Sequence, residues 1–183
     1  KPFSEIKKVL LDVSSLTSVH LCQILCKEYL KIEPDFTTSE QPISLDFDLK
    51  QTDFDAVLVI GDVAFEWEGS FEHEMDLGEA WKEHTGLPFV FAGWACHKDR
   101  AITNELQDIF VHARKEGERN VYDIAKNTVG LHKRELRDLI EYLSLNIKYS
   151  LRDEQIRGID LFRRKLIEHG FVPEDTPPVQ IDS

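Results

Sequence analysis

The sequence has few cysteines and no long apolar run, and each absence excludes a class of protein. Its three cysteines are Cys22, Cys26 and Cys96. That number is odd and too small for the disulfide framework of a small secreted protein. No stretch approaches the roughly 20 uninterrupted apolar residues that a membrane-spanning helix needs. We therefore expect a cytoplasmic protein, in a reducing compartment, with no membrane partner.

An excess of basic residues is also missing, which argues against nucleic acid as a partner. The 183 residues include 34 Asp and Glu but only 22 Lys and Arg, a formal net charge of −12. Phosphate backbones are bound by clustered Lys and Arg. Residues 1–97 hold 18 acidic and seven basic groups, whereas residues 98–170 hold 13 and 15. This shift predicts an α/β lobe over residues 1–97 and a helical segment over 98–183 that returns toward it.

Short apolar runs alternate with helical patterns in the first half, which predicts an α/β fold. Strands are expected at residues 9–11, 55–60 and 89–92. The continuous β-branched run at 55–60 is typical of a parallel strand covered on both faces. Residues 35–53 are polar and indicate a loop, with room for one short strand. This order favours right-handed crossovers between parallel strands.

A helix is expected between the first two strands. Its apolar positions recur at the helical spacing i, i+3, i+4, i+7: Cys22, Leu25, Cys26 and Tyr29. Ser14 and Ser15 precede it as N-cap candidates. Cys22 and Cys26 share one helix face, and packing as small hydrophobes is favoured over a metal site.

The later helices are marked by their ends. Residues 77–84 predict a short helix that Gly86 terminates, and helices dominate after residue 97. The last helix is expected to begin with Asp153 as its N-cap and to end at Gly170. The sequence contains no HExxH, GxSxG, P-loop or GxGxxG motif, so neither a metal nor a nucleotide cofactor is predicted.

Two segments are candidate ligand sites because ligands of open α/β sheets bind beyond the carboxyl ends of the strands. Ser15, Thr17 and Ser18 begin a helix, where free N–H groups attract anions. The alternative is an ordinary cap, which needs only one hydroxyl. Gly61 and Asp62 end the best strand. Asp62 is either a base, a hydrogen-bond acceptor for a ligand, or the cap of the following turn.

Three blocks of the sequence, at residues 12–18, 60–65 and 76–94, resemble the chorismate dehydratase family of the futalosine route to menaquinone. The resemblance implies a type II periplasmic-binding-protein-like fold, in which two α/β lobes hold the ligand between them. Family members begin well upstream of this sequence. We therefore expect a chain that lacks the N-terminal part of the first lobe.

The resemblance also implies a reaction and a set of site residues. The family removes water from chorismate, a dianion, without a cofactor, and forms 3-[(1-carboxyvinyl)oxy]benzoate. Asp62 is the candidate base, unless the base lies upstream of this chain. Leu16 stands where the family usually has Arg. The expected substrate-binding residues are Ser15, Thr17, Ser18, Gly61, Thr85 and Gly86.

Two other functions remain open. A solute-binding or sensor protein can be built on the same fold, and fold alone does not separate it from an enzyme. The sister dihydroxynaphthoate synthase shares the pattern at residues 76–88, but it has a His-containing block where this chain has Gly61 and Asp62. The dehydratase is therefore favoured. The oligomeric state is left open.

Overall fold

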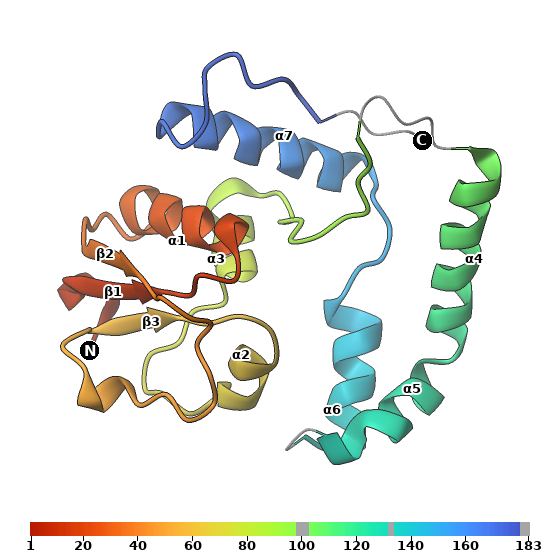
Figure 1. The fold of residues 1–183 in the computed structure, drawn as a ribbon, viewed down its shortest axis with the longest axis horizontal. Coiled ribbons are helices and arrows are strands. Elements are labelled where there is room, and N and C mark those ends of the chain that lie inside the picture. The colour runs from red at the N-terminus through yellow and green to blue at the C-terminus, as the bar shows by residue number, and fades with distance from the viewer. Residues whose placement is uncertain (98–102, 132–133, 180–183) are drawn as a thin grey trace. The chain divides into compact units, whose positions relative to one another are not determined.

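The computed structural model describes residues 1–97, 103–131 and 134–179 (Figure 1). The chain forms two compact units. Unit 1 comprises Lys1–Phe91 and Leu151–Ser183, and unit 2 comprises Ala92–Ser150. The chain therefore leaves unit 1 once and returns to it once.

A three-stranded parallel sheet forms the centre of unit 1. Its strands are β1 (Lys8–Leu11), β2 (Asp35–Thr38) and β3 (Ala56–Leu58), in the order β2-β1-β3. Val9 of β1 lies opposite Phe36 on one side and Ala56 on the other. The predicted α/β class is confirmed, and β2 is the short strand for which residues 35–53 left room.

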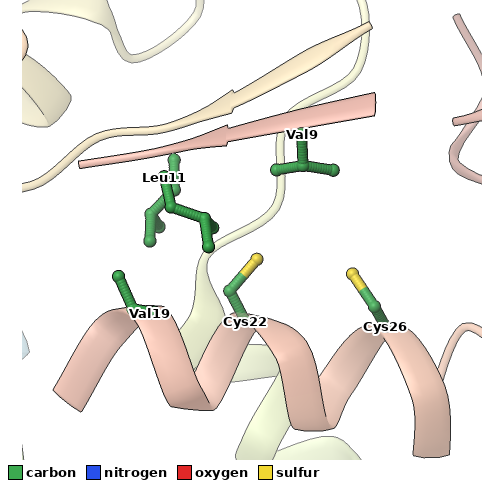
Figure 2. Packing of buried hydrophobic residues seen from close by; sticks show 6 residues of the cluster. Val9, Leu11, Val19, Cys22 and Cys26 are labelled. Atoms are coloured by element: carbon green, nitrogen blue, oxygen red, sulfur yellow. The ribbon is translucent and has the colours of Figure 1, made fainter. Parts of the chain in front are cut away.

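Helix α1 (Leu16–Glu28) is buried on two sides. On one side, Cys22 and Cys26 pack with Val19 against Val9 and Leu11 of β1 (Figure 2). Both thiols therefore pack as small hydrophobes, as predicted. Burying a large apolar side chain contributes about 1.5–3 kcal/mol. The other side of α1 packs against α3 (Leu77–Thr85) and α7 (Asp153–Glu168), and its buried residues are Leu21, Ile24 and Leu25.

The predicted strand at residues 89–92 is wrong, because this described segment lies outside the sheet. The ring of Phe89 packs edge-to-face on Trp81 of α3 and on Phe162 of α7, with centroids 5.5 and 4.9 Å apart. A short apolar run indicates burial, and its periodicity does not separate a strand from an extended core segment. Aromatic contacts, rather than a sheet ladder, hold Phe89, which is half-buried, whereas Phe91 and Ala92 are exposed.

Three helix ends also refine the predictions. Asp153 is the first helical residue of α7, so the N-cap position falls on Arg152. Gly170 follows the end of α7 with φ +70°, as predicted. Gly61 and Asp62 were expected in a turn, but they begin the short helix α2 (Gly61–Trp67).

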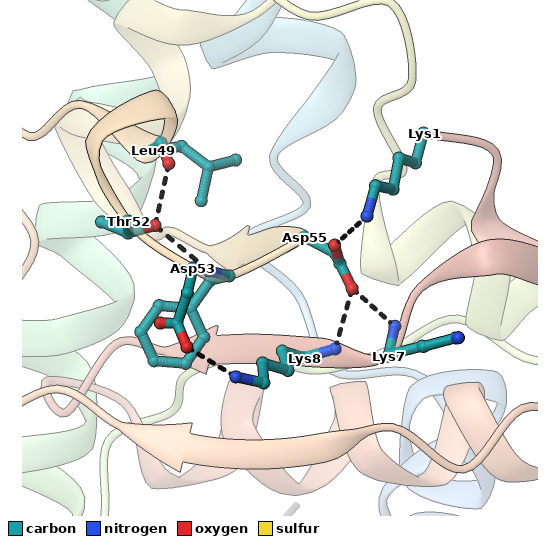
Figure 3. Close-up of polar contacts among 8 residues, drawn as sticks. Lys1, Lys7, Lys8, Leu49, Thr52, Asp53 and Asp55 are labelled. Carbon is teal, nitrogen blue, oxygen red and sulfur yellow. Dashed lines mark hydrogen bonds and ion pairs between the residues drawn. The ribbon is translucent and has the colours of Figure 1, made fainter.

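The amino ends of the strands are joined by polar contacts (Figure 3). One carboxylate oxygen of Asp55 accepts hydrogen bonds from the backbone N–H groups of Lys7 (2.9 Å) and Lys8 (3.2 Å). Its other oxygen pairs with the ammonium group of Lys1. Lys8 extends its own ammonium group to Asp53. Two 3₁₀ turns, Phe3–Glu5 and Leu49–Gln51, complete this part of unit 1.

Unit 2 is helical, as predicted for this stretch. It contains α4 (Asn104–Arg119), α5 (Val121–Thr128) and α6 (Leu136–Glu141). A 3₁₀ turn, Val129–Leu131, follows α5, and a π-helical turn, Tyr142–Asn146, follows α6. In the described ranges of the whole chain, no helix combines the length and the apolar character needed to cross a bilayer.

Candidate functional site at the carboxyl edge of the sheet

The strand order places the candidate site. Since β1 lies between β2 and β3, the chain crosses from one side of β1 to the other, and the order reverses between β1 and β3. Ligands of open α/β sheets bind at this point, beyond the carboxyl ends of the strands. Leu11 of β1 lies opposite Leu58 of β3. The segments that begin at Asp12 and Val59 therefore leave the same edge of the sheet.

Asp12 is the most buried polar residue at this edge, with 2% of its surface exposed. Its Oδ1 accepts a hydrogen bond from the backbone N–H of Ser14 (2.8 Å) and another from the Ser14 hydroxyl. Its Oδ2 accepts from the backbone N–H of Ile43 at 3.1 Å. The carboxylate thus ties the loop after β1 to the segment after β2. A buried carboxylate needs such donors, because burying it unpaired is costly.

Some backbone N–H groups in the first turn of α1 are hydrogen-bonded and others are free. Ser15 is the N-cap, and its hydroxyl oxygen accepts from the Ser18 N–H at 3.2 Å. That hydroxyl also donates to the Ser18 hydroxyl (2.9 Å). The N–H groups of Leu16 and Thr17 have no acceptor among the residues that the structure describes. The cap interpretation holds for Ser15. The expectation that Ser18 binds the substrate is corrected, because its N–H is bonded to Ser15 and the residue is buried. The amides of Leu16 and Thr17 remain for a ligand.

Gly61 and Asp62 lie beyond β3 at the same edge. Gly61 has φ +60°, a conformation that glycine adopts more readily than other residues. A Cβ at this position would meet open space, so the backbone conformation rather than crowding favours glycine. Asp62 is exposed in the first turn of α2. Its carboxylate is therefore accessible to a ligand.

Thr85 and Gly86 do not lie with the other candidates. His84, their neighbour, contacts Glu28 at the carboxyl end of α1 (3.3 Å), whereas Ser15 lies at the opposite end of this helix. A helix of 13 residues is about 20 Å long. The Thr85 hydroxyl donates to the Trp81 carbonyl (2.7 Å), and Gly86 is the left-handed C-cap of α3. The expectation that Thr85 lines one site with Thr17 and Asp62 is corrected: the turn that ends α3 uses it.

A metal centre finds no support in the described parts of the chain, where no group of three or more His, Cys, Asp or Glu side chains is placed to hold an ion. The thiols of Cys22 and Cys26 in α1 pack in the hydrophobic core. The hydrogen bond with Cys26 and burial together raise the pKa of Cys22 well above its usual value. A protonated, buried thiol is a poor nucleophile and metal ligand.

Comparisons with known proteins show the family of the chain. The family model described as menaquinone biosynthesis matches residues 1–168. The chain belongs to this family. The match includes both segments of the carboxyl edge, 12–18 and 60–65.

A relative within the menaquinone biosynthesis family carries a specific name. The chain is 27% identical to a chorismate dehydratase of Thermus thermophilus over 179 residues. The alignment covers 87% of this chain and 62% of the relative. The chain therefore spans less than two thirds of that relative's length.

Asp12 is the residue that the sequence analysis missed as part of the site. The sequence does mark it, as a lone acidic residue directly after three apolar strand residues, with Ser14 and Ser15 following Val13. What could not be predicted is its tie to Ile43, which is 31 residues away.

Proposed function

We propose that the chain provides the ligand-binding edge of a chorismate dehydratase, with the two-lobed, periplasmic-binding-protein-like architecture of that family. The observation that carries the proposal is the pair of free amides at Leu16 and Thr17, at the switch point of a sheet in a menaquinone biosynthesis protein. A substrate carboxylate is expected to accept hydrogen bonds from these amides. Each such charge-assisted bond contributes about 1.5–3 kcal/mol.

The reaction proposed is the elimination of water from chorismate. A base takes the ring proton beside the enol ether, and the electrons of that C–H bond form a ring double bond. The neighbouring C–O bond breaks, and the departing hydroxide recovers the proton as water. The product is 3-[(1-carboxyvinyl)oxy]benzoate, and no cofactor is needed because aromatisation drives the step. Asp62 is proposed as the base or as the acceptor that orients the leaving hydroxyl.

Local groups must attract the dianion, because the chain as a whole has a net charge of −12. The free amides and the α1 dipole supply that attraction over a short range. The Thr17 hydroxyl adds a donor beside them. Leu16 contributes no charge, although 70% of its surface is exposed at this edge.

The test measures chorismate binding and turnover in the full-length protein from which this sequence comes. Thr17→Val removes one hydroxyl donor at similar size, and we expect chorismate affinity to fall about tenfold, which corresponds to a loss near 1.4 kcal/mol. Asp62→Asn is expected to lower turnover far more than stability. Unchanged turnover in Asp62→Asn would leave this residue only its place in the first turn of α2.

A gain-of-function variant gives the sharper result. Leu16→Arg adds a cation beside the free amides, and we expect it to tighten chorismate binding about tenfold. Leu151→Arg is the matched control. Leu151 is also exposed, and an arginine there adds the same charge elsewhere in unit 1. An equal gain in chorismate affinity in both variants would assign the effect to net charge. It would contradict the proposed carboxylate-binding site at the first amides of α1.

The alternatives appear as outcomes of the same experiment. Chorismate binding without turnover favours a solute-binding or sensor protein. Turnover of a different substrate, with no action on chorismate, favours the sister dihydroxynaphthoate synthase. Chorismate should be supplied at low ionic strength, because screening weakens the contacts of exposed charges.

A further inference from the structure

We infer that Asp12 is the positioning residue of this carboxyl edge, a role that rests on the proposed function. Asp12 does not touch the ligand. Its carboxylate fixes the loop after β1 and the segment after β2 relative to each other, and this fixation keeps the first amides of α1 open to a carboxylate.

The hydrogen bonds of Asp12 locate its action. They go to Ser14, one residue before the N-cap, and to Ile43 in the next connection. None of them goes to the amides of Leu16 or Thr17. A carboxylate so near a helix start would be expected to occupy those amides itself. Because its oxygens are engaged by Ser14 and Ile43, the amides stay free.

Burial makes this tie rigid. Asp12 is 2% exposed and Ile43 is 8% exposed, so water does not readily replace either partner. In contrast, Asp48 is an exposed carboxylate in the same connection. It accepts bonds from the Lys50 N–H (3.0 Å) and from the Gln51 side chain (2.9 Å), and both partners lie within its own turn. Asp48 therefore joins no two segments.

The chemistry requires a carboxylate rather than an amide at position 12. Both oxygens of Asp12 accept, and neither faces an acceptor. In Asp12→Asn, one oxygen becomes an NH₂ group, which must face an N–H donor of either Ser14 or Ile43. The hydrogen bond to one of the two segments is lost. The first turn of α1 then becomes more mobile, and ligand binding must pay the entropy of ordering it.

The experiment compares Asp12→Asn with Asp48→Asn in the full-length protein, at a temperature where both are fully folded. We expect Asp12→Asn to raise KM for chorismate about tenfold, to change kcat less than threefold and to shift the amide resonances of Leu16 and Thr17. Asp48→Asn should leave KM and these resonances as in the wild type. A purely structural role for Asp12 would lower the free energy of unfolding without moving KM in the folded protein.

A second variant guards against misfolding of Asp12→Asn. Ser14→Ala removes only the hydroxyl donor from an exposed residue and keeps the N–H bond. It should raise KM in the same direction by a smaller factor, about threefold. Unshifted Leu16 and Thr17 resonances in both variants would overturn the positioning role, as would an equal effect in Asp48→Asn.

The failure of the proposed function looks different from the failure of this inference. If the wild type neither binds nor converts chorismate, the proposed function fails. The resonances of Leu16 and Thr17 still report whether Asp12 holds the start of α1, and a shift confined to the Asp12 and Ser14 variants would support the positioning role alone.

Discussion

At the scale of single residues, two aspartates join segments at the two ends of the sheet. Asp12 connects the loops beyond the carboxyl ends of β1 and β2, and Asp55 caps free N–H groups where β1 begins. Both side chains accept hydrogen bonds from backbone N–H groups through their carboxyl oxygens. They differ in surroundings, because Asp12 is buried whereas Asp55 is paired with the cation of Lys1.

The pKa of Asp55 gives a prediction at this scale. The Lys1 ammonium group, and then the Lys7 N–H, lower the pKa of Asp55 to about 2 (Figure 3). The usual value in an unfolded chain is about 3.9. The folded state therefore binds fewer protons between these values, and Asp55 contributes stability above about pH 4 that is lost as the pH falls toward 2.

We expect Asp55→Asn to be less stable than the wild type at pH 6 and to lose this difference by pH 2. Urea unfolding at a series of pH values measures it. Glu40→Gln, which changes an exposed carboxylate, is the control and should follow the wild type. A difference that stays constant from pH 6 to pH 2 would contradict the assignment.

At the scale of elements, the burial of α1 on two sides decides how unit 1 is assembled. A helix that is apolar around most of its circumference must be covered on most of it. The sheet covers one side of α1, and α3 with α7 covers another. Glu28 adds a polar contact among the same helices, since it pairs with His169 (2.8 Å) and Lys165 (3.1 Å) of the α7 region.

The docking of α7 depends on a small residue. A Cβ at Gly158 would lie 2.2 Å from the carbonyl oxygen of Pro88. Gly158→Ala should therefore destabilise unit 1 by about 1–3 kcal/mol through overpacking. Gly117 of α4 is the matched control, because a Cβ there meets open space. Gly117→Ala should stabilise its helix by up to about 1 kcal/mol, the gain of alanine over glycine.

Chemical denaturation followed by circular dichroism distinguishes the two glycine variants. Opposite signs of the change in the free energy of unfolding support close contact between α7 and Pro88. A stabilised Gly158→Ala variant would show that α7 does not approach Pro88 in solution.

At the scale of the whole molecule, the two units differ in how much they bury. Unit 1 contains two clusters of buried hydrophobic residues, around β1 and around Trp81. In the described parts of unit 2, the fully buried hydrophobic residues are Ala125 and Leu139. Several large apolar side chains of unit 2 are exposed instead, among them Ile109, Tyr122 and Leu145. Local stability follows buried apolar contact.

We therefore expect the backbone amides of α4, α5 and α6 to exchange with solvent at least tenfold faster than those of α1 and β1. Hydrogen exchange followed by mass spectrometry measures this in the chain as it stands. Equal protection in the two units would mean that unit 2 buries more apolar surface in solution, for example in an assembly.

Much of unit 1 could be predicted from local sequence. The apolar spacing of α1 and the serine cap each describe their own element, because periodicity and capping depend on neighbours along the chain. The run at 55–60 predicted a strand, but β3 is shorter, Ala56–Leu58, and lies at the edge of the sheet. The carboxyl edge followed as well. Ser15 and Gly61 lie a few residues beyond the ends of β1 and β3, and parallel strands bring their carboxyl ends to one edge.

The tertiary structure decided what depends on partners far apart in the sequence. The run at residues 89–92 is apolar enough for a strand, yet it lies outside the sheet, where Phe89 packs on the rings of Trp81 and Phe162. Thr85 looked like a site residue, but the approach of His84 to Glu28 places it at the far end of α1. Asp12 links two segments because the backbone N–H of Ile43, 31 residues away, comes within 3.1 Å of its carboxylate. A sequence pattern indicates which residues need to be buried or capped. Which distant residues become their partners depends on how the whole chain packs.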